Sequence, residues 1–306
     1  MFVILKRTLQ ETLKLWTVLL TLAAGVAGGY IIGTTGAGYN TTIYDNLLSR
    51  MLMMQHLVVF FLTYGVVLMA IVSSVGAGLI AGEVHEGTLR ILVAKPNSRM
   101  GILLGKVLGL ITGAILLMVM GLASLLASET FFGTFDINIW RGMMAYVPSY
   151  LLYGAIVMLF FSSLATLFSC LAKKRLVAIL PMLLLMILVL GLPVIIRVVS
   201  MGMGRGQAGG ILAYADLNYH FGCVYKWCLD FCGGIHGNSG ILELPTMLLN
   251  IFKQFMVDKD ITRTHDYSVL TVENDLLKPL TVVTVYAGLT LFNYITSFLV
   301  MRRKDV

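Results

Sequence analysis

GEVHEGTLRILVAKPNSRMGILLG, residues 82–105, is the stretch that decides how this chain folds. Its charged and histidine side chains are Glu83, His85, Glu86, Arg90, Lys95 and Arg99, and Lys106 follows directly. On each side lies enough uninterrupted apolar sequence to cross a bilayer, which takes about 20 residues. A charged segment between two such runs predicts a docking surface for a soluble partner, with the flanking helices responding to it.

The composition of the chain places it among membrane proteins. Of its 306 residues, 58% are hydrophobic and only 12% are charged, whereas soluble domains are about one quarter charged. Backbone groups in lipid must be paired within the protein, so the spans are helices or a closed barrel. Apolar runs of about 20 residues, rather than alternating segments of about ten, indicate helices. We predict an all-α membrane protein with a single transmembrane domain over residues 1–306.

Six apolar runs predict six transmembrane helices, at residues 16–33, 56–81, 102–127, 143–171, 176–199 and 280–301. Before them, residues 1–15 place Leu5, Leu9 and Leu13 on one helical face. This pattern predicts an amphipathic helix lying at the membrane interface. Residues 34–55 and 128–142 are predicted to be short external loops, and residues 200–279 a long external region.

Basic clusters indicate the orientation of the chain. They occur at the amino terminus, in the stretch quoted above, at Lys173, Lys174 and Arg175, and at Arg302, Arg303 and Lys304. With six spans, all four clusters fall on one side, so both termini are predicted to be cytoplasmic. The net charge of +7 comes from these scattered clusters, a distribution that indicates topology and not a nucleic-acid partner.

Glycines recur every four residues in the first predicted span. Gly25, Gly29 and Gly33 form a smooth stripe on one helical face, which lets a second backbone approach closely. The stripe is predicted to pack either against another helix of the chain or against a second copy. We favour packing within the chain.

No catalytic motif is complete in this sequence. The segment from Gly101 to Lys106 resembles a phosphate-binding loop, but its spacing is one residue short and Val107 follows the lysine. His85 and Glu86 match the beginning of a zinc-protease motif, but Leu89 stands where the second histidine belongs. We also expect no Asp, Glu, Lys or Arg between the ends of the spans, which disfavours an ion-coupled carrier. The chain is therefore predicted not to be an enzyme, with no catalytic or metal site.

Three of the four cysteines, Cys223, Cys228 and Cys232, lie in the long external region. They are open to three interpretations: a metal site with nearby histidines, one disulfide with a thiol left over, or packing in a partly buried subdomain. Cys228 and Cys232 would be one turn apart in a helix, which is poor geometry for a bridge. Cys223 is therefore the better partner if a disulfide forms.

The quoted stretch resembles the signature of type-2 ATP-binding-cassette (ABC) exporter permeases. The matching residues are Glu83, Glu86, Gly87, Thr88, Leu89, Arg90 and Leu92, then Lys95, Pro96, Ser98 and Arg99, then Gly105 and Lys106. The topology is similar as well, with an amphipathic leader, six spans and a larger external region before the last span. The external region, about 80 residues long here, is where the sequence departs from the simplest members of the family.

The resemblance implies a permease that pairs with a second permease, identical or homologous, and with two soluble ATPase subunits. ATP and Mg²⁺ would bind the ATPases, so this chain would hold no cofactor. The segment between the second and third spans would form a cytoplasmic coupling helix in a groove of the ATPase. The residues carried over to that joint are Glu83, Glu86, Gly87, Thr88, Arg90, Pro96 and Arg99.

The same stretch supports a short helix on physical grounds. Thr88 can cap a helix and Pro96 can end it. Glu86 and Arg90 are four residues apart and can brace each other. The alternative is a solvated loop whose charges only set the topology.

The sequence therefore predicts the permease subunit of an ATP-driven exporter in the plasma membrane of a bacterium. The weakly polar spans suggest an amphipathic substrate such as a peptide antibiotic, drug or toxin. A different class is a membrane sensor or assembly component that transports nothing and binds a partner through its external region.

Overall fold

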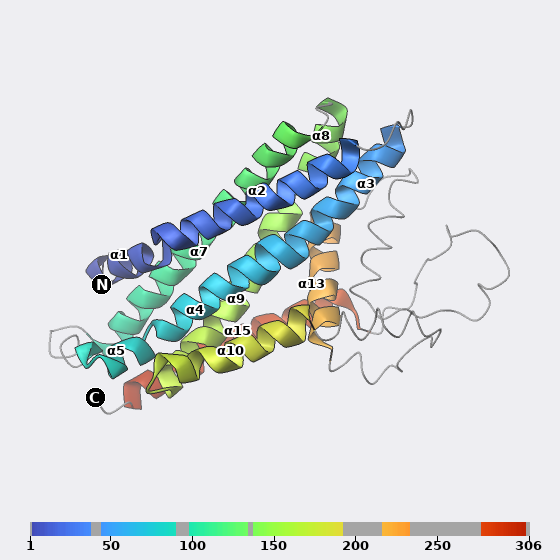
Figure 1. Cartoon of the computed structure of the whole chain (residues 1–306). Helices are drawn as coiled ribbons and strands as arrows, with labels where there is room; N and C mark the ends of the chain where they lie inside the picture. The colour runs from blue at the N-terminus through green and yellow to red at the C-terminus, as the bar shows by residue number, and fades with distance from the viewer. Residues whose placement is uncertain are drawn as a thin grey trace.

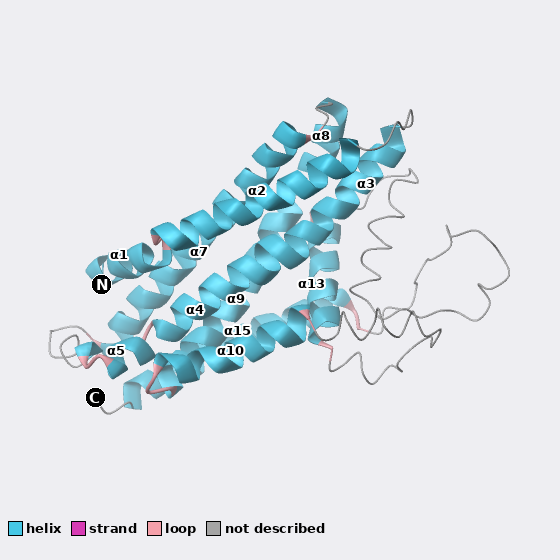
Figure 2. Ribbon diagram, viewed as in Figure 1, coloured by secondary structure: helices cyan, strands magenta, loops and turns pink. Residues whose placement is uncertain are grey.

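The computed structural model describes residues 2–37, 44–89, 98–133, 137–191, 216–232 and 277–303. Within these ranges all regular structure is helical (Figure 1, Figure 2). The helices are α1 (Phe2–Thr12), α2 (Leu15–Ala37), α3 (Tyr44–Leu57), the π-helix η1 (Val58–Leu68), α4 (Met69–Gly78), α5 (Ala81–His85), α7 (Arg99–Phe132), α8 (Ile137–Met144), α9 (Val147–Leu171), α10 (Arg175–Leu190), α13 (Leu217–Phe231) and α15 (Pro279–Arg303). The prediction of an all-α fold is confirmed for the described residues.

Five helical segments are long and apolar enough to cross a membrane: Leu15–Thr34, Met54–His85, Arg99–Phe132, Ile137–Leu171 and Pro279–Arg303. They correspond to the predicted first, second, third, fourth and sixth spans. The predicted fifth span begins as α10, a shorter apolar helix with Pro181 inside it. Its remaining residues, 192–199, lie outside the described part of the chain. The several apolar helices agree with a membrane protein, while the number six stays a prediction.

Helix replaces much of both short loops predicted between the early spans. In residues 34–55, α2 continues to Ala37 and α3 begins at Tyr44. In residues 128–142, α7 continues to Phe132 and α8 begins at Ile137. Polar residues extend α7 because they find partners there: the Ser128 hydroxyl donates to the Val26 carbonyl at 2.8 Å. The loop boundaries drawn from hydropathy were therefore wrong.

The expectation that the spans hold no internal charge is wrong for α7. Lys106 lies inside the predicted third span, residues 102–127, and is only 4% exposed. Glu129, predicted to lie in the external loop 128–142, also belongs to α7 and is 5% exposed. Lys106 is tolerated because a carboxylate pairs with it, as described below. Hydropathy averaged over a long window cannot show such a compensated charge.

Glycines allow α7 to pack closely against α2 and α1. A Cβ atom added at Gly29 would lie 2.4 Å from the Leu125 carbonyl oxygen, and one at Gly25 would lie 2.6 Å from that of Gly121. At Gly33 it would lie 2.8 Å from the Gly133 nitrogen. In the structure the stripe predicted from Gly25, Gly29 and Gly33 therefore faces α7 of the same chain.

The helices form an elongated bundle with distinct ends (Figure 1). The first described helix, the end of α15 and the short helix α5 lie together at one end. Helices α3 and α8 lie at the other end, and α13 packs against α9, α10 and α15. The α5 end is the one to which the predicted coupling segment belongs, so we build the candidate site there.

Candidate functional site

The long helix that starts at Tyr44 breaks where the charged stretch begins. Helix α4 ends at Gly78, Leu79 and Ile80 form a turn, and α5 follows from Ala81 to His85. We call residues 79–89 the elbow. Because the chain changes direction there, the carbonyl groups ending α4 and the N–H groups starting α5 need partners from elsewhere.

Ser169 of α9 supplies the partner for the start of α5. Its Oγ accepts hydrogen bonds from the backbone N–H groups of Ile80 and Ala81, at 2.8 and 3.0 Å. This is a helix cap provided by a neighbouring helix, since the residue before α5 is Ile80, which has no polar side chain. The elbow is therefore fixed to α9.

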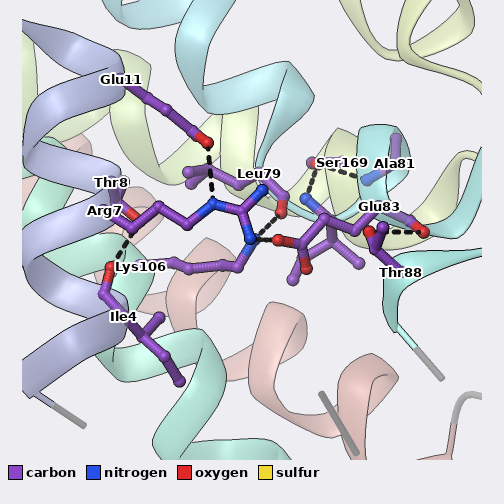
Figure 3. Close-up of polar contacts among 11 residues, drawn as sticks. Ile4, Arg7, Thr8, Glu11, Leu79, Ala81, Glu83, Thr88, Lys106 and Ser169 are labelled. Atoms are coloured by element: carbon purple, nitrogen blue, oxygen red, sulfur yellow. Dashed lines mark hydrogen bonds and ion pairs between the residues drawn. The ribbon is translucent and has the colours of Figure 1, made fainter. Parts of the chain in front are cut away.

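Lys106 of α7 fixes the other side of the elbow (Figure 3). Its Nζ lies 2.7 Å from Oε1 of Glu83 and also donates to the Leu79 carbonyl. One ammonium group thus satisfies the end of α4 and the carboxylate of α5. Both side chains are buried: Glu83 is 7% and Lys106 is 4% exposed.

A buried ion pair of this kind is asymmetric in its energetics. Removing both charges from water is expensive, so the intact pair contributes little net stability. Removing one partner leaves an uncompensated buried charge, which costs about 3–5 kcal/mol. The pair therefore enforces one position of the elbow relative to α7 more than it stabilises the fold.

Two further contacts tie neighbouring helices together at this end, and an ion pair within α1 lies beside them. On α1, Arg7 Nε lies 3.3 Å from Oε1 of Glu11, and both charges are close enough to act electrostatically on Lys106. Arg175 at the start of α10 donates to the carbonyl and the hydroxyl of Ser74, each at 3.2 Å. Arg99 at the start of α7 donates to the Arg302 carbonyl of α15 at 3.4 Å. Displacement of the elbow would therefore reach several helices.

The tip of the elbow is exposed. His85, Glu86 and Gly87 all lie on the surface. Gly87 has φ of +71°, a left-handed conformation that glycine adopts without strain. The chain thereby reverses after α5, and the Thr88 hydroxyl donates to the Glu83 carbonyl at 3.4 Å. The arrangement presents the Glu86 carboxylate outward on a base that is held from two sides.

The residues predicted to couple to the ATPase lie in different environments in the structure. Glu86 and Gly87 are exposed at the tip, Glu83 faces inward to Lys106, and Arg99 contacts α15. Arg90 and Pro96 lie outside the described residues, so the predicted brace between Glu86 and Arg90 stays a prediction. Lys106 was recognised only as part of the motif, although a lysine seven residues into an apolar helix is a signal in itself. Ser169 was missed, and nothing in its local sequence marks it.

The cysteines of the external region occupy one helix. Cys223 and Cys228 are buried in α13 and Cys232 follows its last residue, and all three carry thiols and not a disulfide in the structure. Within the described residues, no group of three or more His, Cys, Asp or Glu side chains has metal-site geometry. The packing interpretation describes how Cys223 and Cys228 lie here.

A comparison with protein-family models matches residues 3–209 to the ABC-2 family transporter proteins. The chain belongs to the ABC-2 transporter family. The matched residues include α1, the elbow, Lys106 and Ser169, and they end before α13 and α15. A search of curated proteins found no match.

Loss of the Ser169 hydroxyl should loosen the elbow of this ABC-2 protein. We expect Ser169→Ala to lower the free energy of unfolding by about 1–3 kcal/mol, because two buried N–H groups lose their acceptor. Denaturation with SDS in mixed micelles measures this. Ser149→Ala is the matched control, since Ser149 is a fully buried serine of the same helix whose hydroxyl has no partner within the described residues. Equal losses in both variants would contradict the capping role.

Proposed function

We propose that this chain is the permease subunit of an ATP-driven exporter and that a separate ATPase docks on its elbow. One observation carries the proposal: an exposed carboxylate, Glu86, directly follows a short helix whose buried carboxylate, Glu83, is ion-paired to α7. A partner that moves the tip therefore moves a helix of 34 residues. Membership in the ABC-2 family supports the same conclusion.

The remaining parts of the proposal follow from the family and the apolar character of the helices. ATP hydrolysis takes place on the ATPase, and two permease copies or homologues assemble in the cell membrane of a bacterium. Both termini and the elbow face the cytoplasm, which agrees with their position at one end of the bundle (Figure 1). The exported molecule is amphipathic, because the helices offer an apolar surface with a few buried polar groups.

Charge reversal at the tip tests the proposal directly. The ATPase encoded by a gene next to that of this chain is expressed with an affinity tag and purified. Its binding to the permease in nanodiscs is then measured. We expect Glu86→Lys to weaken binding at least about tenfold, since a charge of the wrong sign costs several kcal/mol at an interface. Because Glu86 is exposed, the thermal stability of the permease alone should not change.

A variant at the opposite end of the bundle serves as the control. Arg141 is an exposed charge on α8, and Arg141→Glu should bind the ATPase as the unmodified chain does. Unchanged binding by Glu86→Lys, or an equal loss in Arg141→Glu, would contradict docking at the elbow. A permease that binds no ABC ATPase at all would favour the sensor hypothesis.

A further inference from the structure

Helix α13 packs within the helix bundle but is too short to cross the membrane. Its 15 residues extend about 22 Å, less than the bilayer core of about 30 Å. It does not belong to the five segments long enough to span. Nevertheless it is largely buried, including residues as polar as Asn218 and as large as Tyr219, Phe221 and Tyr225. It also lies beyond the part of the chain that matches the ABC-2 family.

The first turns of α13 are anchored to α10 and α15. The Asp216 carboxylate caps the helix by accepting from the Tyr219 N–H at 3.0 Å. Asn218 Nδ2 donates to the Val189 carbonyl of α10 at 2.7 Å. His220 Nδ1 lies 3.2 Å from the Tyr286 hydroxyl of α15. These contacts hold one end of the helix in place.

A polar cluster holds the middle of α13 against α3 and α9. His56 Nδ1 lies 2.6 Å from the Tyr225 hydroxyl and 3.2 Å from the Tyr150 hydroxyl. The Tyr150 hydroxyl also donates to Oε1 of Gln55 at 3.2 Å. We call Gln55, His56, Tyr150 and Tyr225 the latch. All four side chains are at most 1% exposed, although a histidine and a glutamine are costly in such a place.

The latch is incompletely satisfied. Within the described residues, Nε2 of His56 and the amide nitrogen of Gln55 have no hydrogen-bond partner, and neither does the nearby Tyr153 hydroxyl. The Tyr153 ring packs against Tyr225 with centroids 4.9 Å apart. Each buried unpaired group makes the closed arrangement less favourable. The site also directly precedes η1, and π-helical segments occur frequently at functional sites.

We propose that α13 is an outer gate on the route of the exported molecule, and that the latch around His56 keeps this gate closed. The proposal deepens the proposed function and rests on it. When α13 moves away, the polar groups of the latch become accessible on an otherwise apolar route. The latch suits this task because hydrogen bonds between helices in membrane proteins are weak enough to open.

Native thiols report the position of α13, so no cysteine has to be introduced. Cys223 and Cys228 lie on α13 and are completely buried, and burial also raises the pKa of the Cys228 thiol. Cys170 lies near the other end of α9 and is 1% exposed, so it reports unfolding of the bundle. The rate at which each thiol reacts with N-ethylmaleimide is measured by peptide mass spectrometry, on the complete chain in nanodiscs without ATPase.

Tyr225→Phe removes the hydroxyl that contacts His56 and retains the ring. We expect it to accelerate the labelling of Cys223 and Cys228 about three- to tenfold, which corresponds to losing one such hydrogen bond, while Cys170 stays slow. Tyr146→Phe is the control: its ring also packs on His56, with centroids 5.0 Å apart, and it should change nothing. Unchanged rates in Tyr225→Phe, or equal acceleration of Cys170, would overturn the gate.

A second arm separates the gate from the proposed function. With the purified ATPase and ATP, we expect faster labelling of Cys223 and Cys228 than with a nonhydrolysable ATP analogue. A latch effect in the first arm without an ATP effect in the second would leave α13 mobile but overturn its role in export. A chain that binds no ATPase would contradict the proposed function, whereas the first arm would still measure the latch.

Discussion

Replacing Lys106 with methionine, or Glu83 with glutamine, is expected to lower the free energy of unfolding by about 3–5 kcal/mol. Each substitution leaves one partner of the 2.7 Å pair charged or polar and buried without compensation. Lys106→Met should be the more harmful of the two, because it also deprives the Leu79 carbonyl of its donor. SDS denaturation in mixed micelles measures the loss, and thermal unfolding in nanodiscs confirms it.

The double variant, Glu83→Gln with Lys106→Met, distinguishes the pair from its parts. With both charges removed, we expect stability to recover to within about 1–2 kcal/mol of the unmodified chain, because neither buried charge is left uncompensated and the remaining loss is the donor to the Leu79 carbonyl. The control is Arg7→Gln, which breaks an ion pair at the same end whose side chains are 57% and 41% exposed. That change should cost less than about 1 kcal/mol.

Function should not recover with stability. In the double variant the elbow packs against α7 without the ion pair between Glu83 and Lys106. We therefore expect the ATPase to bind the permease as before, while the permease no longer changes the rate at which the ATPase hydrolyses ATP. The measurement is ATP turnover by the purified ATPase with permease variants in proteoliposomes. Full stimulation by the double variant would mean that the pair serves only the fold.

Hydropathy, charge and glycine spacing, which are local features of the sequence, predicted the apolar helices, the charged segment between two of them and one close helix contact. Hydropathy located the apolar helices because burial in lipid is decided residue by residue along a run. The position of the charged stretch between two spans was also predictable, and its exposed tip at Glu86 agrees with a docking surface. The glycine spacing of Gly25, Gly29 and Gly33 predicted a close approach, although it could not say which helix approaches.

Long-range compensation could not be predicted. The Ser169 hydroxyl reaches a backbone 89 residues earlier in the sequence, and a serine in a membrane helix is too common to signal this. The family resemblance assigned Glu83 to the joint with the ATPase, and only the position of Lys106 shows why this carboxylate is buried. Likewise, His56 and Tyr225 are 169 residues apart. The helix that carries Tyr225 and packs against His56 therefore lies in a region that was predicted to be a long external segment.

Gly29→Ala is expected to destabilise the bundle by about 3 kcal/mol, at the upper end of the usual cost of overpacking. The added Cβ would meet the Leu125 carbonyl oxygen at 2.4 Å and the Glu129 nitrogen at 2.7 Å. Both are backbone atoms of α7, so no side chain can rotate away and the two helices must separate. Helix propensity alone would make alanine more favourable than glycine by up to about 1 kcal/mol. A large decrease in the free energy of unfolding would therefore come from the steric clash. SDS denaturation gives the free energy of unfolding.

Gly288→Ala on α15 is the matched control, because its Cβ would meet nothing within 4 Å. It should be neutral or slightly stabilising for the reason of helix propensity alone. The pair of variants also decides between the two interpretations of the glycine stripe. If the stripe faces α7, Gly29→Ala lowers the stability of the single chain and leaves its oligomeric state unchanged. If the stripe instead joined two copies, light scattering would show dissociation while the unfolding of each chain remained unaffected, and the packing of α2 against α7 described here would be wrong.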